Sequence, residues 1–238
     1  MRVETSAGDP VVLLPGMNCS SRMWSPVIDG LEARGYSREI RCETLAGSSL
    51  EACAEELLER LPDRFALAGL SLGGIVAMAL VRAAPSRVSR LCLMATNPRG
   101  PRTDQLEAWG SLRERLRAGE TARQIQLELL PVLLAADRRE ALDDLVLQMA
   151  DDVGECALEE QLRMQSTRID ERAALAQIDI PTTILAGGRD LLCPVTTHQE
   201  MASLVSGSQL IVLPHRGHLL TLEDPQSVAS ALDTWLRT

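Results

Sequence analysis

The stretch FALAGLSLGG, residues 65–74, joins an apolar run to a serine with glycine two positions before it and two positions after it. The apolar run has the length and composition of a strand that is buried on both faces. Residues 72–84 are mostly apolar and end before a proline, which predicts a helix. The small residues let strand and helix approach closely. The stretch therefore predicts a sharp strand-to-helix turn that exposes the Ser71 hydroxyl.

Apolar runs and helical patterns alternate along most of the chain. Besides 65–70, strands are predicted at residues 11–15, 91–95, 182–187 and 210–214, with a weaker candidate at 36–43. Helices are predicted at residues 22–34, 49–61, 72–84, 196–205 and 225–236. This alternation is typical of βαβ units. The fold class is therefore α/β, with a mostly parallel sheet of about six strands and helices on both faces.

The alternation is interrupted once, between residues 101 and 176, where only helical periodicity is found. Helical patterns cover residues 104–119, 121–136, 138–152 and 155–167, and Pro131 is expected to bend or divide the second. Such a segment between two strands is expected to be an insertion at the edge of the sheet. We therefore predict a core of residues 1–100 and 177–238 and an α-helical cap of residues 101–176.

Composition excludes several functions. The net charge of −9 disfavours a nucleic-acid partner, and all 24 basic residues are arginine, which excludes the chemistry of a catalytic lysine. Six scattered cysteines without a C-x-x-C pair indicate a reducing compartment rather than a metal site or disulfides. Neither a signal segment nor a membrane span is expected. The sequence predicts a cytoplasmic protein without metal or cofactor, acting on a small molecule, and leaves the oligomeric state open.

Two later loops supply partners for the serine. Asp190 in GGRD follows the strand 182–187, and His218 in GHLLTLEDP follows the last strand, so both are expected at the carboxyl edge of the sheet. Asp224 is interpreted as a helix N-cap, and His198 and His215 as surface or supporting histidines. A hydroxyl needs a base and an orienting carboxylate to act as a nucleophile at neutral pH. The order Ser71, Asp190, His218 fits one hydrolase topology.

These motifs resemble the α/β-hydrolase fold family, in its serine esterase-like form with a helical cap, over nearly the whole chain. VVLLPGMNCSSRMW (11–24) resembles the oxyanion loop of that family, with Pro15-Gly16 in place of the usual His-Gly. The resemblance implies Ser71 as nucleophile, His218 as base and Asp190 as its orienting carboxylate. It implies an oxyanion hole formed by the backbone N–H groups of Met17 and Leu72. The N-terminal strands are shortened, so at most a stub of a further edge strand is expected before residue 11.

The expected function is hydrolysis of a carboxylic ester of a small or medium, mainly aliphatic acyl substrate through an acyl-enzyme. Thioesterase, lactonase and C–C hydrolase activities share this machinery and remain alternatives. A non-catalytic ligand-binding protein and a recruited lyase or cyclase are further alternatives. The roles of Cys19 and Cys193 and any motion of the cap are left open. The predicted substrate-pocket residues are Trp24, Asn97, Trp109, Leu191 and Leu219.

Overall fold

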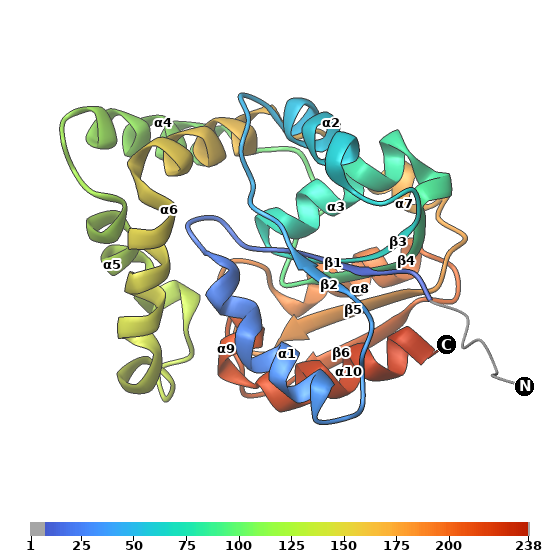
Figure 1. The fold of residues 1–238 in the computed structure, drawn as a ribbon. Coiled ribbons are helices and arrows are strands. Elements are labelled where there is room, and N and C mark those ends of the chain that lie inside the picture. The colour runs from blue at the N-terminus through green and yellow to red at the C-terminus, as the bar shows by residue number, and fades with distance from the viewer. Residues whose placement is uncertain (1–7, 238) are drawn as a thin grey trace, which may run out of the picture.

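The computed structural model, which describes residues 8–237, has the predicted α/β architecture (Figure 1). All strand pairs are parallel, and the six strands follow the order β2-β1-β3-β4-β5-β6. The strands are β1 (Val11–Leu14), β2 (Ile40–Cys42), β3 (Phe65–Leu70), β4 (Val88–Met94), β5 (Thr182–Gly187) and β6 (Gln209–Leu213). The parallel arrangement brings the carboxyl ends of all six strands to one edge, where the predicted site residues follow.

Two apolar cores lie on opposite faces of the sheet. Side chains of β1 alternate between them, because Val11 and Leu13 pack into one core and Val12 and Leu14 into the other. The first core is covered by α1 (Ser25–Glu32), α9 (Leu220–Glu223) and α10 (Pro225–Arg237). The second is covered by α2 (Leu50–Arg60), α3 (Leu72–Ala83) and α8 (Val195–Leu204). Two 3-10 turns, η1 (Ser21–Trp24) and η2 (Pro85–Arg87), complete this part of the chain.

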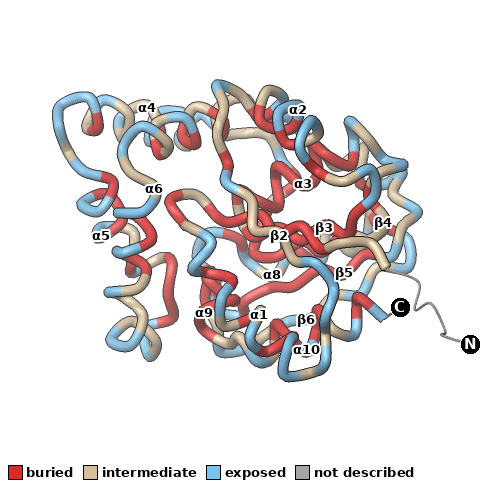
Figure 2. The backbone as a smooth tube through the Cα atoms, in the orientation of Figure 1, coloured by how far each residue is buried: buried red, intermediate tan, exposed pale blue. Residues whose placement is uncertain are grey.

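The outer strands differ from the prediction. Strands β1, β3 and β5 are buried along their whole length, whereas β6 consists of exposed and half-buried residues only (Figure 2). The run 210–214 is therefore not buried on both faces, because β6 is an edge strand with one neighbour. The weak candidate at 36–43 forms the other edge strand, β2. The expected stub of a further strand falls largely on residues outside the described range.

The segment between β4 and β5 is helical, as predicted, and consists of α4 (Thr103–Arg117), α5 (Ala122–Leu133), α6 (Arg139–Thr167) and α7 (Arg172–Leu175). Helices α4, α5 and α6 stand beside the sheet and share a small apolar core of their own (Figure 1). Gly154, with φ of 73°, interrupts α6 between the two predicted patterns. Pro131 does not divide α5, since it lies in the last turn, where the helix ends two residues later. No helix among residues 8–237 is both long and apolar enough to cross a membrane.

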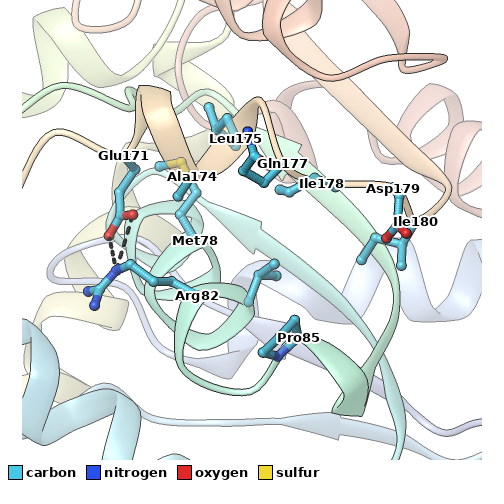
Figure 3. A pocket seen from close by; sticks show the side chains of 11 residues that line it. Met78, Arg82, Pro85, Glu171, Ala174, Leu175, Gln177, Ile178, Asp179 and Ile180 are labelled. Carbon is cyan, nitrogen blue, oxygen red and sulfur yellow. Dashed lines mark hydrogen bonds and ion pairs between the residues drawn. The ribbon is translucent and has the colours of Figure 1, made fainter.

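Helix α7 belongs to the same segment but packs against α3 and α8 of the core. The buried carboxylate of Glu171, directly before α7, accepts hydrogen bonds from Arg82 Nε of α3 at 3.1 and 3.2 Å (Figure 3). Beside this pair, a mainly apolar cavity lies between α3, α7 and the segment leading into β5. A second cavity lies at Ser71, and the two cavities have no lining residue in common. The contact between α7 and the core is therefore separate from the candidate site.

Candidate active site

Ser71 sits in the predicted turn between β3 and α3 with strained backbone dihedrals, φ 55° and ψ −115°. The glycines around it allow this turn. A Cβ added at Gly69 would lie 2.2 Å from the Gly73 oxygen, and one added at Gly73 would lie 2.3 Å from the Leu14 oxygen. The Ser71 carbonyl accepts a hydrogen bond from Thr96 Oγ1 at 2.8 Å, which ties the turn to the end of β4. The turn thus holds the serine at the carboxyl edge of the sheet.

His218 and Asp190 form a buried pair at the same edge. His218 Nδ1 lies 2.8 Å from Asp190 Oδ2, while Asp190 Oδ1 accepts the backbone N–H groups of Leu192 and Cys193 at 2.8 and 2.9 Å. Burial raises the pKa of Asp190, but the charge and hydrogen bond of His218 and the two backbone donors outweigh it and lower that pKa overall. The carboxylate therefore stays ionised and orients the imidazole, whose ring lies on the wall of the cavity that Ser71 lines.

The turn at Asp190 also corrects one prediction. Because Asp190 Oδ1 binds the N–H groups of the second and third residues after it, the chain wraps around the carboxylate. Leu191 at the tip of this turn points outward and is 71% exposed, so it does not line the cavity. Leu192 and Cys193 line it instead.

The loop after β1 lies against the serine turn, as expected for an oxyanion loop. A Cβ added at Gly16 would lie 3.7 Å from Ser71 Cβ, and Met17 lines the cavity. Among the described residues, no acceptor is found for the Met17 N–H. Leu72 is the first residue of α3, so its N–H has no partner within the helix. Two backbone N–H groups are thus available beside Ser71.

The cavity at Ser71 has a volume of about 240 Å³ and is roofed by the inserted helices. Of the predicted pocket residues, Asn97, Trp109 and Leu219 line it. Trp24 does not, because the η1 turn directs its indole into the core between the sheet and α1, where it is fully buried. Sequence reasoning missed the polar residues that the helices contribute to this wall, namely Gln105, Gln126, Gln165 and Arg168.

A buried hydrogen-bond network joins the oxyanion loop to the inserted helices. Asn18, which follows Met17, has φ of 56° and is fully buried. Its backbone N–H donates to Gln161 Oε1 of α6 at 2.8 Å, and its Nδ2 donates to Gln126 Oε1 of α5 at 2.8 Å. Because every partner is a side chain or backbone group of α5 or α6, the conformation of the loop after β1 depends on the position of these helices.

The loop that carries His218 is also hydrogen-bonded to the inserted helices. Glu223 Oε2 accepts the N–H of Gly217 at 2.7 Å and that of Ala135 at 3.3 Å, and His218 N–H donates to the Leu133 oxygen at 3.1 Å. Leu133 is the last residue of α5, and Ala135 follows two residues after it. Burial raises the pKa of Glu223, although the backbone donors oppose this. The loops that carry the N–H of Met17 and the ring of His218 are therefore both held by the inserted helices.

The thiols of Cys19 and Cys193 lie on the cavity wall, and that of Cys193 is close to the His218–Asp190 pair. Burial raises the pKa of Cys19 to about 12 and also raises the pKa of Cys193. Within the described chain, ligand atoms of Asp190, Cys193 and His218 lie within 4.8 Å of one another. The Asp190 oxygens already hold three hydrogen bonds, and a metal would need the Cys193 thiolate that burial disfavours. The pairing of His218 with Asp190 accounts for this group.

His198 lies beneath the site rather than at the surface. It is fully buried, its Nδ1 lies 3.1 Å from the Pro194 oxygen, and the Thr96 N–H donates to its Nε2 at 3.1 Å. A carbonyl can only accept and an amide N–H can only donate, so the ring is neutral with its proton on Nδ1. Burial correspondingly lowers the pKa of His198. The ring links α8 to Thr96, which in turn bonds Ser71.

We expect His198 to make the fold sensitive to acid. Unfolding returns its pKa to the ordinary 6.5, so below that pH the unfolded chain binds more protons than the folded one. The free energy of unfolding should therefore fall as pH drops below about 6.5, by up to about 1.4 kcal/mol per pH unit from this group. Urea denaturation at several pH values should show a shallower fall for His198→Gln, and an unchanged slope for His215→Gln, an exposed histidine. Equal slopes for both variants would contradict this role.

Comparison with known proteins places the chain among proteins of one fold. A model described as the alpha/beta hydrolase family matches residues 11–231. The chain is 28% identical over 252 residues to the pimeloyl-[acyl-carrier protein] methyl ester esterase of Nitrosomonas europaea, which covers 98% of each protein. It is 30% identical over 243 residues to the biotin biosynthesis bifunctional protein BioHC of Cellvibrio japonicus. That alignment covers 96% of this chain and 47% of the bifunctional protein, so the chain spans about half of that relative.

Solved structures show the same fold. A thermophilic esterase from Thermogutta terrifontis superposes with a TM-score of 0.83 at 26% identity, over 98% of this chain and 91% of the esterase. The enol-lactonase from Burkholderia xenovorans also superposes with a TM-score of 0.83, at 19% identity, and covers 99% of this chain. The second likeness concerns the fold alone.

Proposed function

Because the chain belongs to the alpha/beta hydrolase family, we propose that it is a serine hydrolase that cleaves carboxylic esters at Ser71. One observation carries this proposal: the His218 ring, oriented by the ionised Asp190, lines the same cavity as the strained Ser71 turn. The relatives named as esterases support the reaction type. No cofactor is needed for this chemistry.

In the proposed mechanism, His218 Nε2 takes the proton of the Ser71 hydroxyl as its oxygen attacks the ester carbonyl carbon. The negative charge that develops on the carbonyl oxygen is stabilised by the N–H groups of Met17 and Leu72, the second of which also lies at the positive end of α3. His218 then protonates the departing alcohol, leaving an acyl-enzyme. Water, deprotonated by His218, attacks this acyl group, and the proton returns to Ser71 as the acid leaves.

The cavity favours a small or medium aliphatic acyl group. Its volume is about 240 Å³, and leucine and isoleucine side chains from α3, α4 and α5 form much of its wall. Trp109 is the single aromatic residue on that wall among the described residues. Since several relatives are named as methyl ester esterases acting on a carrier-bound acyl chain, methyl esters of medium-chain acids are the first substrates to examine. Thioesters and lactones pass through the same acyl-enzyme and remain the second choice.

We further propose that residues 101–176 act as the cap of this enzyme and that residues 1–100 and 177–238 form its catalytic core. The helices α4, α5 and α6 supply the roof of the cavity, and the hydrogen bonds that Asn18 donates to Gln126 and Gln161 join this roof to the oxyanion loop. The six unpaired cysteines suit a reducing compartment, so we place the reaction in the cytoplasm.

The proposal is tested with two assays on the purified chain. A fluorophosphonate probe should label the protein, and peptide mapping should place the label on Ser71. A series of methyl and p-nitrophenyl esters, run beside thioesters of the same acyl chains, should give turnover that is highest for oxygen esters. Binding of these compounds without labelling or turnover would instead identify a ligand-binding protein on this fold.

A further inference from the structure

Arg168 places a buried positive charge on the wall of the cavity that holds Ser71. It is the C-cap residue directly after α6, and it is only 6% exposed. The guanidinium stacks over the Trp109 ring, with its central carbon 5.2 Å from the ring centroid. A buried arginine is rare in proteins unless a carboxylate or another anion accompanies it.

The hydrogen-bond partners of Arg168 are neutral. One terminal nitrogen donates to Gln165 Oε1 at 3.1 Å and the other to Gln105 Oε1 at 2.9 Å. A guanidinium has five N–H donors, so these bonds engage two of them, and Nε is buried without a partner. In the described part of the chain, no carboxylate lies within ion-pair distance of Arg168. The structure thus leaves this cation without a counter-ion.

The contrast with Arg82 shows what is missing. Arg82 binds the buried carboxylate of Glu171 at 3.1 Å and also lies 3.5 Å from Glu51. Arg168 is the more deeply buried of the two, yet its polar neighbours are amides. Burial lowers the pKa of Arg168, which means that the surroundings do not compensate its charge. An arginine remains charged even so.

The cavity itself offers no anion to Arg168. The Asp190 carboxylate is committed to His218 and two backbone N–H groups, and the raised pKa values of Cys19 and Cys193 keep both thiols neutral. A ligand with a negative group would therefore meet a buried cation that has no counter-ion. A planar carboxylate matches the guanidinium fork.

We propose that Arg168 binds a free carboxylate at the far end of the acyl chain, so that the preferred substrate is a half-ester of a dicarboxylic acid. This inference rests on the proposed ester hydrolysis at Ser71. The ester group of the substrate lies at Ser71, its methylene chain lies along the apolar wall, and its carboxylate replaces the missing counter-ion of Arg168. Arg168 is then a specificity-determining residue that takes no part in bond making or breaking.

The test compares charged and neutral esters of equal chain length. Monomethyl esters of straight-chain dicarboxylic acids with four to eight carbons are run beside methyl esters of monocarboxylic acids of matching length. For the best chain length we expect the wild type to prefer the half-ester. Arg168→Gln should lower kcat/KM for that half-ester about 10- to 100-fold, mainly through KM, because it removes a charge-assisted hydrogen bond. Its kcat/KM for the neutral ester should fall much less, so that the preference for the half-ester over the neutral ester is reduced or lost.

Arg163→Gln is the matched control, because Arg163 lies in α6, its side chain is 44% exposed, and it does not line the cavity. It should change neither kcat/KM. If Arg168→Gln fails to fold, free dicarboxylates should still inhibit hydrolysis of the neutral ester competitively in the wild type, and monocarboxylates of equal length should not. Equal activity of the wild type on both ester types, or equal inhibition by both acids, would overturn the role of Arg168. Absence of both turnover and fluorophosphonate labelling would instead overturn the proposed function.

Discussion

Replacing Ser71 with alanine is expected to lower kcat for the best ester by a factor of about 10⁴–10⁶, because the nucleophile is lost while the rest of the site remains. The cavity wall, the His218–Asp190 pair and the fold do not depend on the Ser71 hydroxyl, for which the described residues provide no protein acceptor. Ester hydrolysis and fluorophosphonate labelling should both be lost. Ser203→Ala, an exposed serine at the end of α8, should leave both unchanged. Turnover above about 1% of wild type in Ser71→Ala would show that another group is the nucleophile.

Ser71 also stores backbone strain that a second variant can reveal. Its dihedrals, φ 55° and ψ −115°, are the mirror image of an extended conformation, which glycine adopts freely and alanine does not. Strain of this kind costs about 1–3 kcal/mol. Ser71→Gly should therefore be as inactive as Ser71→Ala but should unfold at a higher urea concentration. This difference separates the role of the side chain in chemistry from the cost of holding it in the turn.

The strands could be predicted because each central strand of a parallel sheet is covered on both faces and must be apolar throughout. Such a strand therefore appears in the sequence as a short, continuous apolar run. Phe65–Leu70 is an example, and its predicted and observed bounds agree. The edge strand β6 carries nearly the same apolar run and is half-exposed, because its position in the sheet depends on strand order and not on its own sequence. Helix bounds followed from local signals in the same way, including the interruption of α6 near Gly154.

The site residues on loops after strands were predictable for a related reason. Parallel topology brings Ser71, Asp190 and His218 to one edge whatever the side chains around them. The direction of a side chain within a loop has no such rule. Leu191 points outward because Asp190 binds the backbone beyond it, and Trp24 points inward because η1 turns it toward the core.

The polar wall supplied by the cap could not be predicted from the sequence. In the sequence, Gln126, Gln161 and Arg168 are polar residues of the kind that usually face solvent. They are buried because the inserted helices lie over the edge of the sheet. That docking is a tertiary contact for which no local motif exists. A glutamine whose amide binds a backbone N–H of the oxyanion loop 143 residues away has a role that only the structure can show.

Asp190→Asn is expected to lower kcat about 10⁴-fold with little change in structure, and the hydrogen bonds of Asp190 explain why. Oδ1 accepts two backbone N–H groups, so the asparagine oxygen must occupy that position and its NH₂ group must face His218. An NH₂ group donates, which forces Nδ1 of His218 to become an acceptor and moves the ring proton to Nε2. In that tautomer the ring cannot take the proton of Ser71.

Asp224→Asn is the matched control for Asp190→Asn. Asp224 is the carboxylate that the sequence predicts as a helix N-cap, and its Oδ1 caps α10 by accepting the Ser227 N–H at 3.1 Å. Asp224→Asn keeps a capping oxygen and should retain kcat within about threefold, since asparagine and aspartate cap helices about equally well. Both variants carry the same change of charge and shape, so a difference of several orders of magnitude between them must come from the tautomer of His218. If Asp190→Asn retained kcat within about tenfold of wild type, His218 would not be the base that Asp190 orients.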